Sequence, residues 1–432
     1  MKVLFVTTDN FPNCGACASL LVNLFGTEAL RQKISQIDVL TLLYTQQDAR
    51  TETINGVTVY RAKTAAFISM AELKKNMIRH PMDYIGGTAQ KIYQKLSRRF
   101  KKKSVFWKKN VADCLYRKLV EMKAAQRYDV IVAMSGAYEA AAAVMDYRNK
   151  HDCRFVFYQV DPCSSNAMYG KRTAIQRQNF EKEIYQMADG VITTPILYRE
   201  KIGVYEDILL EKVCQMEFPN VEPENYQFDE KRDDSHVRCV YAGRIYRRIR
   251  DPRYACALFG SLSPEIELHL IGVSREELNF FLDGQPIPKN VICHGLCLLK
   301  ETQRQIAQAD ILVNIGNEMH NQVPSKLFEY ISAGKPILNL CVNADCPTLP
   351  YLQKHPFALS ILTTEVSVEK AAAEVETFLR KNKGSVMGKM EICRIYKTCT
   401  AEYCGEQMAQ VLEKAINNGE NYGGENGYSG HQ

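Results

Sequence analysis

The sequence predicts the α/β fold class, with two doubly wound parallel sheets. Short apolar runs recur along the 432 residues, and a segment of helix length follows each run. The runs are continuous rather than alternating with polar residues, which is typical of strands buried on both faces of a parallel sheet. The chain is 46% hydrophobic, so it has enough apolar side chains for about two or three domains.

The expected strands fall into two groups, and each group is large enough for a sheet of its own. The strands of the first half are VLFVTT from Val3, YDVIVAMS from Tyr128, RFVFYQVD from Arg154 and GVITTP from Gly190. The strands of the second half are VRCVYAG from Val237, IELHLIGV from Ile266, NVICHGL from Asn290, ADILVNIG from Ala309 and KPILNLC from Lys335. Open parallel sheets bind ligands at the carboxyl ends of their strands, so functional motifs are expected directly after these runs.

A polar and strongly charged stretch, residues 217–236, lies between the two groups and contains two prolines. Such a composition is typical of a linker, and we place the domain boundary at about Asn220. The predicted domains are residues 1–219 and 220–416, and the last helix of the second could pack back on the first. Residues 417–432 are rich in Gly and Asn and are expected to form a disordered tail.

The composition argues against several other classes of protein. A net charge of +6 is mild for this length and does not indicate a nucleic-acid-binding protein. The 15 cysteines are odd in number and scattered, which favours free thiols in a reducing cytosol over a disulfide framework. The N-terminus lacks the features of a signal peptide, and no run of about 18 apolar residues suggests a spanning helix. We therefore expect a soluble, cytoplasmic protein that binds no nucleic acid.

The stretch PSKLFEYISAGKP, residues 324–336, predicts a short helix that opens at Ser325 and closes at Gly334. The unpaired amides of its first turn form a potential anion site, and Lys326 adds a positive charge there. Glu329 lies in an otherwise apolar turn, where a carboxylate is costly unless something binds it. It could accept two hydrogen bonds from the hydroxyls of a sugar ring. The alternative is a capped surface helix whose Glu329 faces water.

The stretch YAGRIYRRIRDP, residues 241–252, directly follows the expected strand from Val237. Gly243 allows a ligand to approach the backbone closely. Four arginines follow it, and a loop of arginines at the carboxyl end of a strand suits a diphosphate. The alternative is a solvated basic loop. The arginines are Arg244, Arg247, Arg248 and Arg250.

A loop of small residues, DNFPNCGACASLLVNL at residues 9–24, follows the first expected strand. Gly15 and its small neighbours leave room for a ligand near the start of the next helix. Cys14 and Cys17 have the spacing of a disulfide oxidoreductase, but such a motif needs a domain around it, and only one strand precedes this one. The CHGLC stretch from Cys293 lacks the second pair of ligands that a zinc site needs. We expect no metal site.

Together these motifs resemble the GT-B glycosyltransferases, and specifically the retaining group 1 or family four enzymes. PSKLFEYISAGKPIL matches the family pattern of Pro, then Glu-Tyr, then Ala-Gly-Lys-Pro. AGRIYRRIRDP is similar to the loop that opens the family's C-terminal domain, and ADGVITTPILYREKI and FPNV are similar to the end of its N-terminal domain and its linker. The resemblance extends from Met1 to about Ile416. It implies two Rossmann-like doubly wound domains that face each other across a cleft.

The resemblance also implies a function, the transfer of a hexose-type sugar from a nucleotide-diphosphate donor, in cell-surface polysaccharide synthesis. In such an enzyme Glu329 would hold the ribose hydroxyls, while Arg244 and the amides at Ser325 and Lys326 would face the diphosphate. A saccharide or polyprenyl-linked acceptor would bind on the N-terminal domain, beside the Gly15 loop and Asp161. The reaction would need neither a metal nor a cofactor besides the donor. Gly243, Arg250 and Asn321 would complete the donor site.

Two positions depart from the family pattern. Asn321 replaces a glutamate that addresses the donor sugar in many members, and Ile249 stands where a lysine is expected. Two alternatives therefore stay open. One is a sugar-nucleotide epimerase of the same fold, and the other is a non-catalytic partner subunit that has kept the fold without the donor site.

The segment KIYQKLSRRFKKKSVFWKKN, residues 91–110, contains nine Lys or Arg residues, no acidic residue and the only Trp of the chain. Basic residues interleaved with aromatic ones suit an anionic membrane surface. We therefore expect peripheral attachment to the inner face of the cell membrane through this segment. A solvated basic helix and a nucleic-acid patch are the alternatives.

Overall fold

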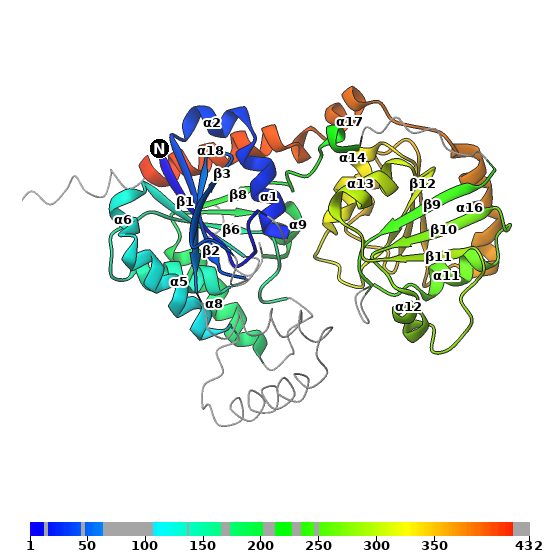
Figure 1. Cartoon of the computed structure of the whole chain (residues 1–432), viewed down its shortest axis with the longest axis horizontal. Coiled ribbons are helices and arrows are strands. Elements are labelled where there is room, and N and C mark those ends of the chain that lie inside the picture. The colour runs from blue at the N-terminus through cyan, green and yellow to red at the C-terminus, as the bar shows by residue number, and fades with distance from the viewer. Residues whose placement is uncertain are drawn as a thin grey trace, which may run out of the picture. The chain divides into compact units, whose positions relative to one another are not determined.

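The computed structural model describes residues 1–12, 16–44, 48–63, 107–135, 138–165, 173–201, 212–226, 235–245 and 250–417. The chain forms two compact units (Figure 1). The first unit combines Met1–Pro219 with Glu402–Gln432, and the second is Asn220–Ala401. The C-terminal helix of the chain thus belongs to the first unit, although it follows the second unit in the sequence.

The described part of the first unit is built on an eight-stranded sheet with the order β3-β4-β2-β1-β5-β6-β7-β8. All neighbouring strands pair in parallel except β3, which pairs antiparallel with β4. The strands are β1 Lys2–Val6, β2 Gln36–Leu42, β3 Thr51–Ile54, β4 Val57–Ala62, β5 Val130–Met134, β6 Phe155–Gln159, β7 Gly190–Thr193 and β8 Val213–Gln215. The apolar runs of β1, β5 and β6 are almost entirely buried, as expected for a sheet covered on both faces.

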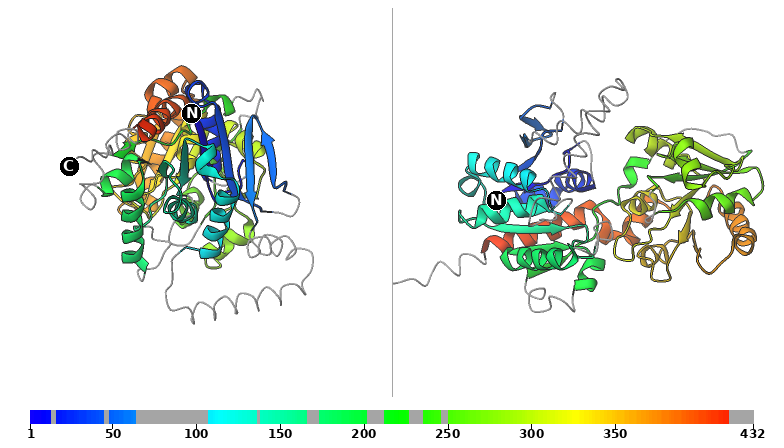
Figure 2. Two further views of the ribbon diagram at one scale, coloured as in Figure 1. Left: turned by 90° about the vertical axis from the view of Figure 1, so that its left-hand side faces the viewer. Right: turned by 90° about the horizontal axis from the view of Figure 1, so that it is seen from below.

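Helices cover both faces of this sheet (Figure 2). They are α1 Ala16–Phe25, α2 Glu28–Lys33, α5 Lys109–Glu121, α6 Ala124–Arg127, α7 Glu139–Arg148, α8 Ala174–Met187, α9 Pro195–Lys201 and α18 Ala401–Asn417. The C-terminal helix α18 packs directly on the sheet, because a Cβ atom at Gly190 of β7 would lie 3.1 Å from the side chain of Val411. The carboxylate of Glu402 in α18 also accepts hydrogen bonds from the backbone N–H groups of Glu28 and Ala29, at the start of α2.

In the second unit, the described residues form a six-stranded parallel sheet with the order β11-β10-β9-β12-β13-β14. Counted along the chain this order is 3-2-1-4-5-6, which is that of the doubly wound dinucleotide-binding fold. The strands are β9 Val237–Ala242, β10 Ile266–Ile271, β11 Val291–Gly295, β12 Ile311–Ile315, β13 Ile337–Cys341 and β14 Ala358–Leu362. The predicted fold class, α/β with two doubly wound sheets, is confirmed.

The helices of the second unit begin with the short 3-10 helix η2, which precedes the first strand. They are η2 Pro223–Tyr226, α11 Arg253–Gly260, α12 Arg275–Phe281, α13 Leu299–Ala307, α14 Ser325–Ala333, α15 Leu349–Leu352, α16 Val368–Asn382, α17 Lys389–Ile395 and η3 Lys397–Cys399. One core of this unit joins side chains of α11 and α16 to the inward-facing residues of β9, β10 and β11.

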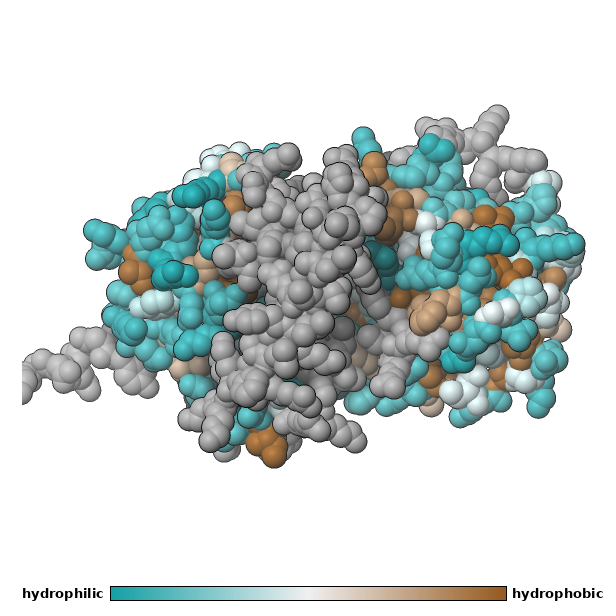
Figure 3. Space-filling view, turned by 60° about the horizontal axis from the view of Figure 1, so that its bottom comes forward, coloured by the Kyte–Doolittle hydropathy of each residue, from teal (hydrophilic) through white to brown (hydrophobic). Residues whose placement is uncertain are grey.

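Within the described ranges, no helix is long and apolar enough to cross a membrane. The coloured part of the surface in Figure 3 carries mainly hydrophilic side chains, with hydrophobic ones scattered among them. Exposed apolar side chains are normal on the surface of a globular protein when they are scattered in this way.

Gly334 closes α14 as the sequence predicted, in the left-handed conformation with φ 65°. A Cβ atom there would lie 2.5 Å from the backbone oxygen of Met387, which cannot move aside as a flexible side chain could. Gly384 has a similar φ of 78°, but a Cβ atom there would meet nothing within 4 Å. The two glycines therefore separate the cost of backbone conformation from the cost of steric overlap.

We predict that Gly334→Ala lowers the free energy of unfolding by roughly 3 kcal/mol or more, because it combines left-handed strain with the overlap on Met387. Gly384→Ala should cost only the strain, about 1–2 kcal/mol. Urea unfolding followed by circular dichroism measures both. Equal losses in the two variants would contradict the steric account of Gly334.

Candidate functional site

The candidate site lies where the strand order of the second unit reverses, between β9 and β12. These strands are neighbours in the sheet, but their connections run in opposite directions, and doubly wound folds bind their ligands in a crevice at the carboxyl ends of such a strand pair. Gly243 and Arg244 directly follow β9, while Gly316 and Asn317 directly follow β12. The sheet thus brings the predicted arginine loop and the chain leading to α14 to the same edge.

Tyr330 ties α14 to this edge of the sheet. Its side chain is fully buried, and its hydroxyl accepts a hydrogen bond from the Ala242 N–H at 2.7 Å, at the last residue of β9. The hydroxyl also lies 3.4 Å from the Ala242 carbonyl oxygen, to which it can donate. Burial raises the pKa of Tyr330, so the group stays a neutral phenol. The contact fixes α14 relative to the backbone that carries Gly243 and Arg244.

Arg250 links the loop after β9 to the loop after β12. Its Nε and one terminal nitrogen donate to the side-chain oxygen of the buried Asn317 at 3.1 and 2.9 Å. Its other terminal nitrogen lies 3.3 Å from the carbonyl oxygen of Arg244, which also accepts a 2.8 Å bond from the Tyr241 hydroxyl. The Arg244 side chain itself is exposed. Arg250 therefore holds the crevice together, whereas Arg244 presents its charge to solvent.

Gly243 fits this packing because it has no side chain. A Cβ atom there would lie 2.9 Å from the Tyr241 hydroxyl oxygen and 3.4 Å from the guanidinium of Arg250. A side chain would therefore push apart two of the groups that hold the backbone of Arg244 in place.

The start of α14 carries the predicted anion site and the predicted carboxylate. Pro324 precedes the helix and has no side-chain acceptor for the first-turn amides. Glu329 is partly buried, because 24% of its side chain is exposed, and its Oε2 atom lies 2.7 Å from Lys326 Nζ. The carboxylate is therefore paired with a lysine and partly open to solvent. Asn321, in the loop before α14, is buried.

The sequence analysis missed Tyr226, which also contacts the carboxylate. Tyr226 ends η2, and its hydroxyl donates to Glu329 Oε2 at 3.2 Å. The segment before it follows α14, since the Ser332 hydroxyl accepts from the Glu222 N–H at 2.8 Å and lies 3.2 Å from the Asn220 carbonyl oxygen. The available signal was an aromatic residue in the otherwise polar stretch EPENYQ, within the predicted linker of residues 217–236.

In the first unit, Asp161 follows β6 in a loop held by backbone hydrogen bonds. The Ser135 hydroxyl, at the end of β5, accepts from the N–H groups of Val160 at 2.8 Å and Asp161 at 3.2 Å. The Tyr138 hydroxyl donates to the Asp161 carbonyl oxygen at 3.1 Å. These bonds leave the half-buried carboxylate of Asp161 at the carboxyl edge of the sheet.

A buried ion pair supports this loop from beneath. Lys201 Nζ lies 2.8 Å from Glu181 Oε2, and the two side chains are only 4% and 0% exposed. The remaining bonding capacity of the carboxylate is used as well, because Gln159 donates to Oε1 and the Ser164 hydroxyl donates to Oε2, each at 2.7 Å. A buried pair is tolerated when such additional bonds satisfy it.

Several predicted residues lie outside the described ranges. They include Gly15, Cys14, Arg247, Arg248, Ile249, residues 91–106 and residues 418–432. Cys17, the second cysteine of the small-residue loop, is buried, and its N–H donates to Asp9 Oδ2 at 2.8 Å. Among the described residues, no group of three or more His, Cys, Asp or Glu side chains is placed to hold a metal ion.

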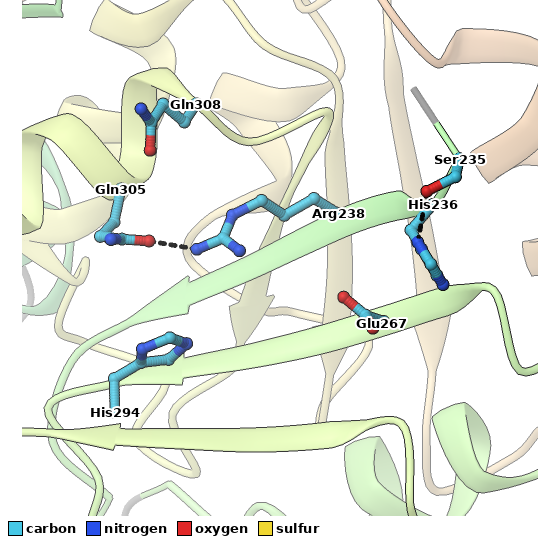
Figure 4. A pocket seen from close by; sticks show the side chains of 7 residues that line it. All are labelled: Ser235, His236, Arg238, Glu267, His294, Gln305 and Gln308. Carbon is cyan, nitrogen blue, oxygen red and sulfur yellow. Dashed lines mark hydrogen bonds between the residues drawn. The ribbon is translucent and has the colours of Figure 1, made fainter. Parts of the chain in front are cut away.

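A cavity of about 320 Å³ lies elsewhere in the second unit (Figure 4). Arg238 of β9 and Glu267 of β10 are register partners near the amino ends of their strands, away from the crevice. Glu267 Oε2 lies 3.0 Å from His269 Nε2, and His269 Nδ1 lies 2.9 Å from His294 Nε2. Burial and the Arg238 charge lower the pKa of His269 to about 4, and they also lower the pKa of His294. Both imidazoles are therefore neutral at neutral pH. The cavity is lined by Ser235, His236, Arg238, Glu267, His294, Gln305 and Gln308.

Comparison with solved structures identifies the fold. Sucrose-phosphate synthase from Thermosynechococcus elongatus is similar over 98% of both chains, at 13% identity and a TM-score of 0.64. WaaG, a glycosyltransferase of lipopolysaccharide biosynthesis, matches 96% of this chain and 99% of its own, at 12% identity and a TM-score of 0.56. HepE of Anabaena, solved with UDP and glucose, matches 98% of this chain and 99% of its own, at 14% identity and a TM-score of 0.55.

A different kind of enzyme shares the fold. A protein from Listeria monocytogenes described as a UDP-N-acetylglucosamine 2-epimerase matches 96% of this chain and 97% of its own, at 11% identity and a TM-score of 0.52. No family model and no curated protein matches the sequence. The structural similarities confirm the predicted likeness in fold to the GT-B glycosyltransferases.

We predict that Lys201→Met lowers the free energy of unfolding of the first unit by about 3–5 kcal/mol, because it leaves the Glu181 carboxylate buried without its partner charge. Trp107, the only Trp of the chain, stacks on Phe180 in this unit at a ring distance of 4.1 Å. Its fluorescence in urea therefore reports the transition.

Lys33→Met is the matched control. Lys33 pairs with Glu413 at 3.0 Å, but the side chains are 54% and 39% exposed, so the loss should stay below about 1 kcal/mol. Equal small losses in both variants would show that the Glu181 pair does not support the fold.

Proposed function

We propose that this protein is a glycosyltransferase that moves a hexose-type sugar from a nucleotide-diphosphate donor to a saccharide or lipid-linked acceptor. The observation that carries the proposal is the arrangement of groups where the strand order reverses, between β9 and β12. Tyr330 and Arg250 hold a helix start, an exposed arginine and a paired carboxylate at one edge of the sheet. HepE has been solved with UDP-glucose, and WaaG acts in lipopolysaccharide biosynthesis, which supports the same class of donor.

The proposed donor site assigns one role to each group. The first-turn amides at Ser325 and Lys326 and the exposed Arg244 bind the diphosphate, while Gly243 lets it approach the backbone. Glu329 accepts hydrogen bonds from the ribose hydroxyls. Lys326, paired with Glu329 in this structure, has a flexible side chain that can turn to the phosphates.

Fewer residues are proposed to contact the donor sugar and the acceptor than to contact the nucleotide. Asn321 lies before the helix start and would address the donor sugar, and Arg250 keeps the two loops in place. In the first unit, Asp161 at the carboxyl edge of the sheet would orient the acceptor hydroxyl, beside the loop that contains Gly15.

In the proposed reaction, the bond between the anomeric carbon and the phosphate oxygen breaks as the acceptor oxygen bonds to the same carbon. The acceptor attacks from the face that the phosphate leaves, and its proton passes to the leaving phosphate, so the configuration is retained without an enzymatic nucleophile. Arg244, Lys326 and the start of α14 stabilise the charge that grows on the diphosphate. The proposal therefore requires neither a metal nor a further cofactor.

A sugar-nucleotide epimerase is the second candidate, because the Listeria protein has the same fold. Product analysis distinguishes the two activities. Transfer releases a nucleoside diphosphate from a labelled nucleotide sugar, whereas epimerisation keeps the nucleotide and sugar joined. A protein that binds no nucleotide sugar in calorimetry would instead be the non-catalytic subunit that Asn321 and Ile249 leave open.

We predict that Glu329→Ala weakens donor binding by roughly 1.5–3 kcal/mol for each lost hydrogen bond to the charged acceptor. Calorimetry with nucleotide sugars measures the effect. Glu301→Ala, which removes an exposed carboxylate of α13 that bonds Gln305, is the control and should leave affinity unchanged. Wild-type affinity and turnover in Glu329→Ala would remove Glu329 from the site.

We also propose peripheral membrane attachment through residues 91–110, a segment whose first sixteen residues lie outside the described ranges. The argument rests on its basic charge. Trp107 is taken out of this argument, because it stacks on Phe180 in the core of the first unit.

We predict binding to vesicles that contain anionic lipid, since each Lys or Arg near the headgroups contributes about 1 kcal/mol. Binding should fall with added salt and with Glu at Lys101, Lys102 and Lys103. The same charge change at Lys370, Lys381 and Lys397, which are exposed in the second unit, should have little effect. Equal binding to neutral vesicles would end this idea.

A further inference from the structure

Tyr226 and Lys326 both donate hydrogen bonds to the same carboxylate oxygen of Glu329. Glu329 Oε2 accepts from the Tyr226 hydroxyl at 3.2 Å and from Lys326 Nζ at 2.7 Å. Among the residues that the structure describes, these are the hydrogen bonds of the Glu329 side chain, and both use Oε2. The contacts therefore fix the rotation of the carboxylate while its other oxygen, Oε1, keeps its lone pairs for a ligand.

Tyr226 is suited to be a permanent donor. Burial raises the pKa of Tyr226, and the negative charge of Glu329 raises it further, so the hydroxyl keeps its proton at any physiological pH. A hydrogen bond from a neutral hydroxyl to a carboxylate is also stronger than one between two neutral groups.

The segment that carries Tyr226 is anchored at several points within the second unit. The Val221 N–H donates to the Cys399 carbonyl oxygen at 3.0 Å, and the Glu222 N–H donates to the Ser332 hydroxyl at 2.8 Å. Pro223, the first residue of η2, is buried. The Tyr226 ring is thus presented to α14 by a fixed backbone rather than by a loose linker.

When a nucleotide sugar binds, only one of the two partners of Glu329 is expected to stay in contact with it. Lys326 is proposed above to turn toward the diphosphate, and it would then leave the carboxylate. Tyr226 has no such competing ligand, so it remains to hold Glu329 in the orientation that two neighbouring ribose hydroxyls require.

We infer that Tyr226 is a positioning residue, which makes the site select ribose over deoxyribose nucleotides by holding the Glu329 carboxylate. This inference rests on the proposed function. Tyr226, which lies before the first strand of the second unit, would then be one of the residues that determine donor specificity.

The test compares a ribonucleoside diphosphate with its 2′-deoxy form, using whichever of UDP, ADP and GDP the wild-type protein binds best in calorimetry. The wild type should prefer the ribose form by about tenfold or more, the value of a hydrogen bond to a charged group. Tyr226→Phe should weaken binding of the ribose form about fivefold and of the deoxy form less, because the deoxy form has only one hydroxyl left to bond Glu329, so the preference shrinks. A structural defect would weaken both forms equally.

Two further variants complete the test. Tyr254→Phe removes a hydroxyl of α11 that donates to the Val366 carbonyl oxygen at 2.9 Å, and it should retain the full preference for ribose. In a Glu329→Gln background, Tyr226→Phe should have no further effect on the preference.

The outcomes separate this inference from the proposed function. Normal nucleotide binding with an unchanged ribose preference in Tyr226→Phe would overturn the role of Tyr226 alone, as would an equal loss for both sugars. Failure of the wild-type protein to bind any of the three diphosphates would overturn both.

Discussion

The Tyr330 hydroxyl bond to the backbone of Ala242 is the constraint on which the candidate site depends. Leaving a phenol buried without a hydrogen bond is costly, and the partner of Tyr330 is the last residue of the strand that leads into the arginine loop. The bond therefore links two parts of the chain that are 88 residues apart. Together with the contact between Arg250 and Asn317, it fixes the start of α14 relative to the loop after β9.

Around this link, each group performs one task. Arg250 donates its hydrogen bonds to Asn317 and to the backbone carbonyl of Arg244, while the side chain of Arg244 is exposed. Glu329 is held from two sides, by its own helix and by η2. The crevice is thus organised before any ligand arrives, which lowers the cost of ordering side chains on binding.

The sequence predicted most of the strands that lie inside the sheets, because a short continuous apolar run indicates a strand that is buried on both faces. It missed β2, β3, β4, β8 and β14. Strand β2 contains Asp38, whose buried carboxylate is satisfied by the Tyr128 hydroxyl at 2.5 Å, a contact that no local pattern announces. The β3–β4 hairpin lies at the sheet edge and alternates polar with apolar residues. Its signal was the pair Asn55 and Gly56, both at positive φ, as tight hairpin turns require.

For the candidate site, the sequence predicted the motifs but not which of their side chains contact one another. The motifs around Arg244 and Glu329 follow strands, and parallel topology brings such loops to one edge. The binding of Arg250 depends on Asn317, a residue with no distinguishing local signal. The role of Tyr226 depends in the same way on a backbone path that only the folded unit defines.

The position of α18 has a consequence for how the protein is made. This helix packs on β7 and caps α2 in the first unit, yet it is synthesised after all of Asn220–Ala401. At translation rates of about 5–20 residues per second, the apolar face that α18 covers is exposed for on the order of 10–40 s while the second unit emerges from the ribosome. The second unit has no such wait, since its strands and helices are contiguous. The half of the chain that is made first is therefore the half that receives its last structural element latest.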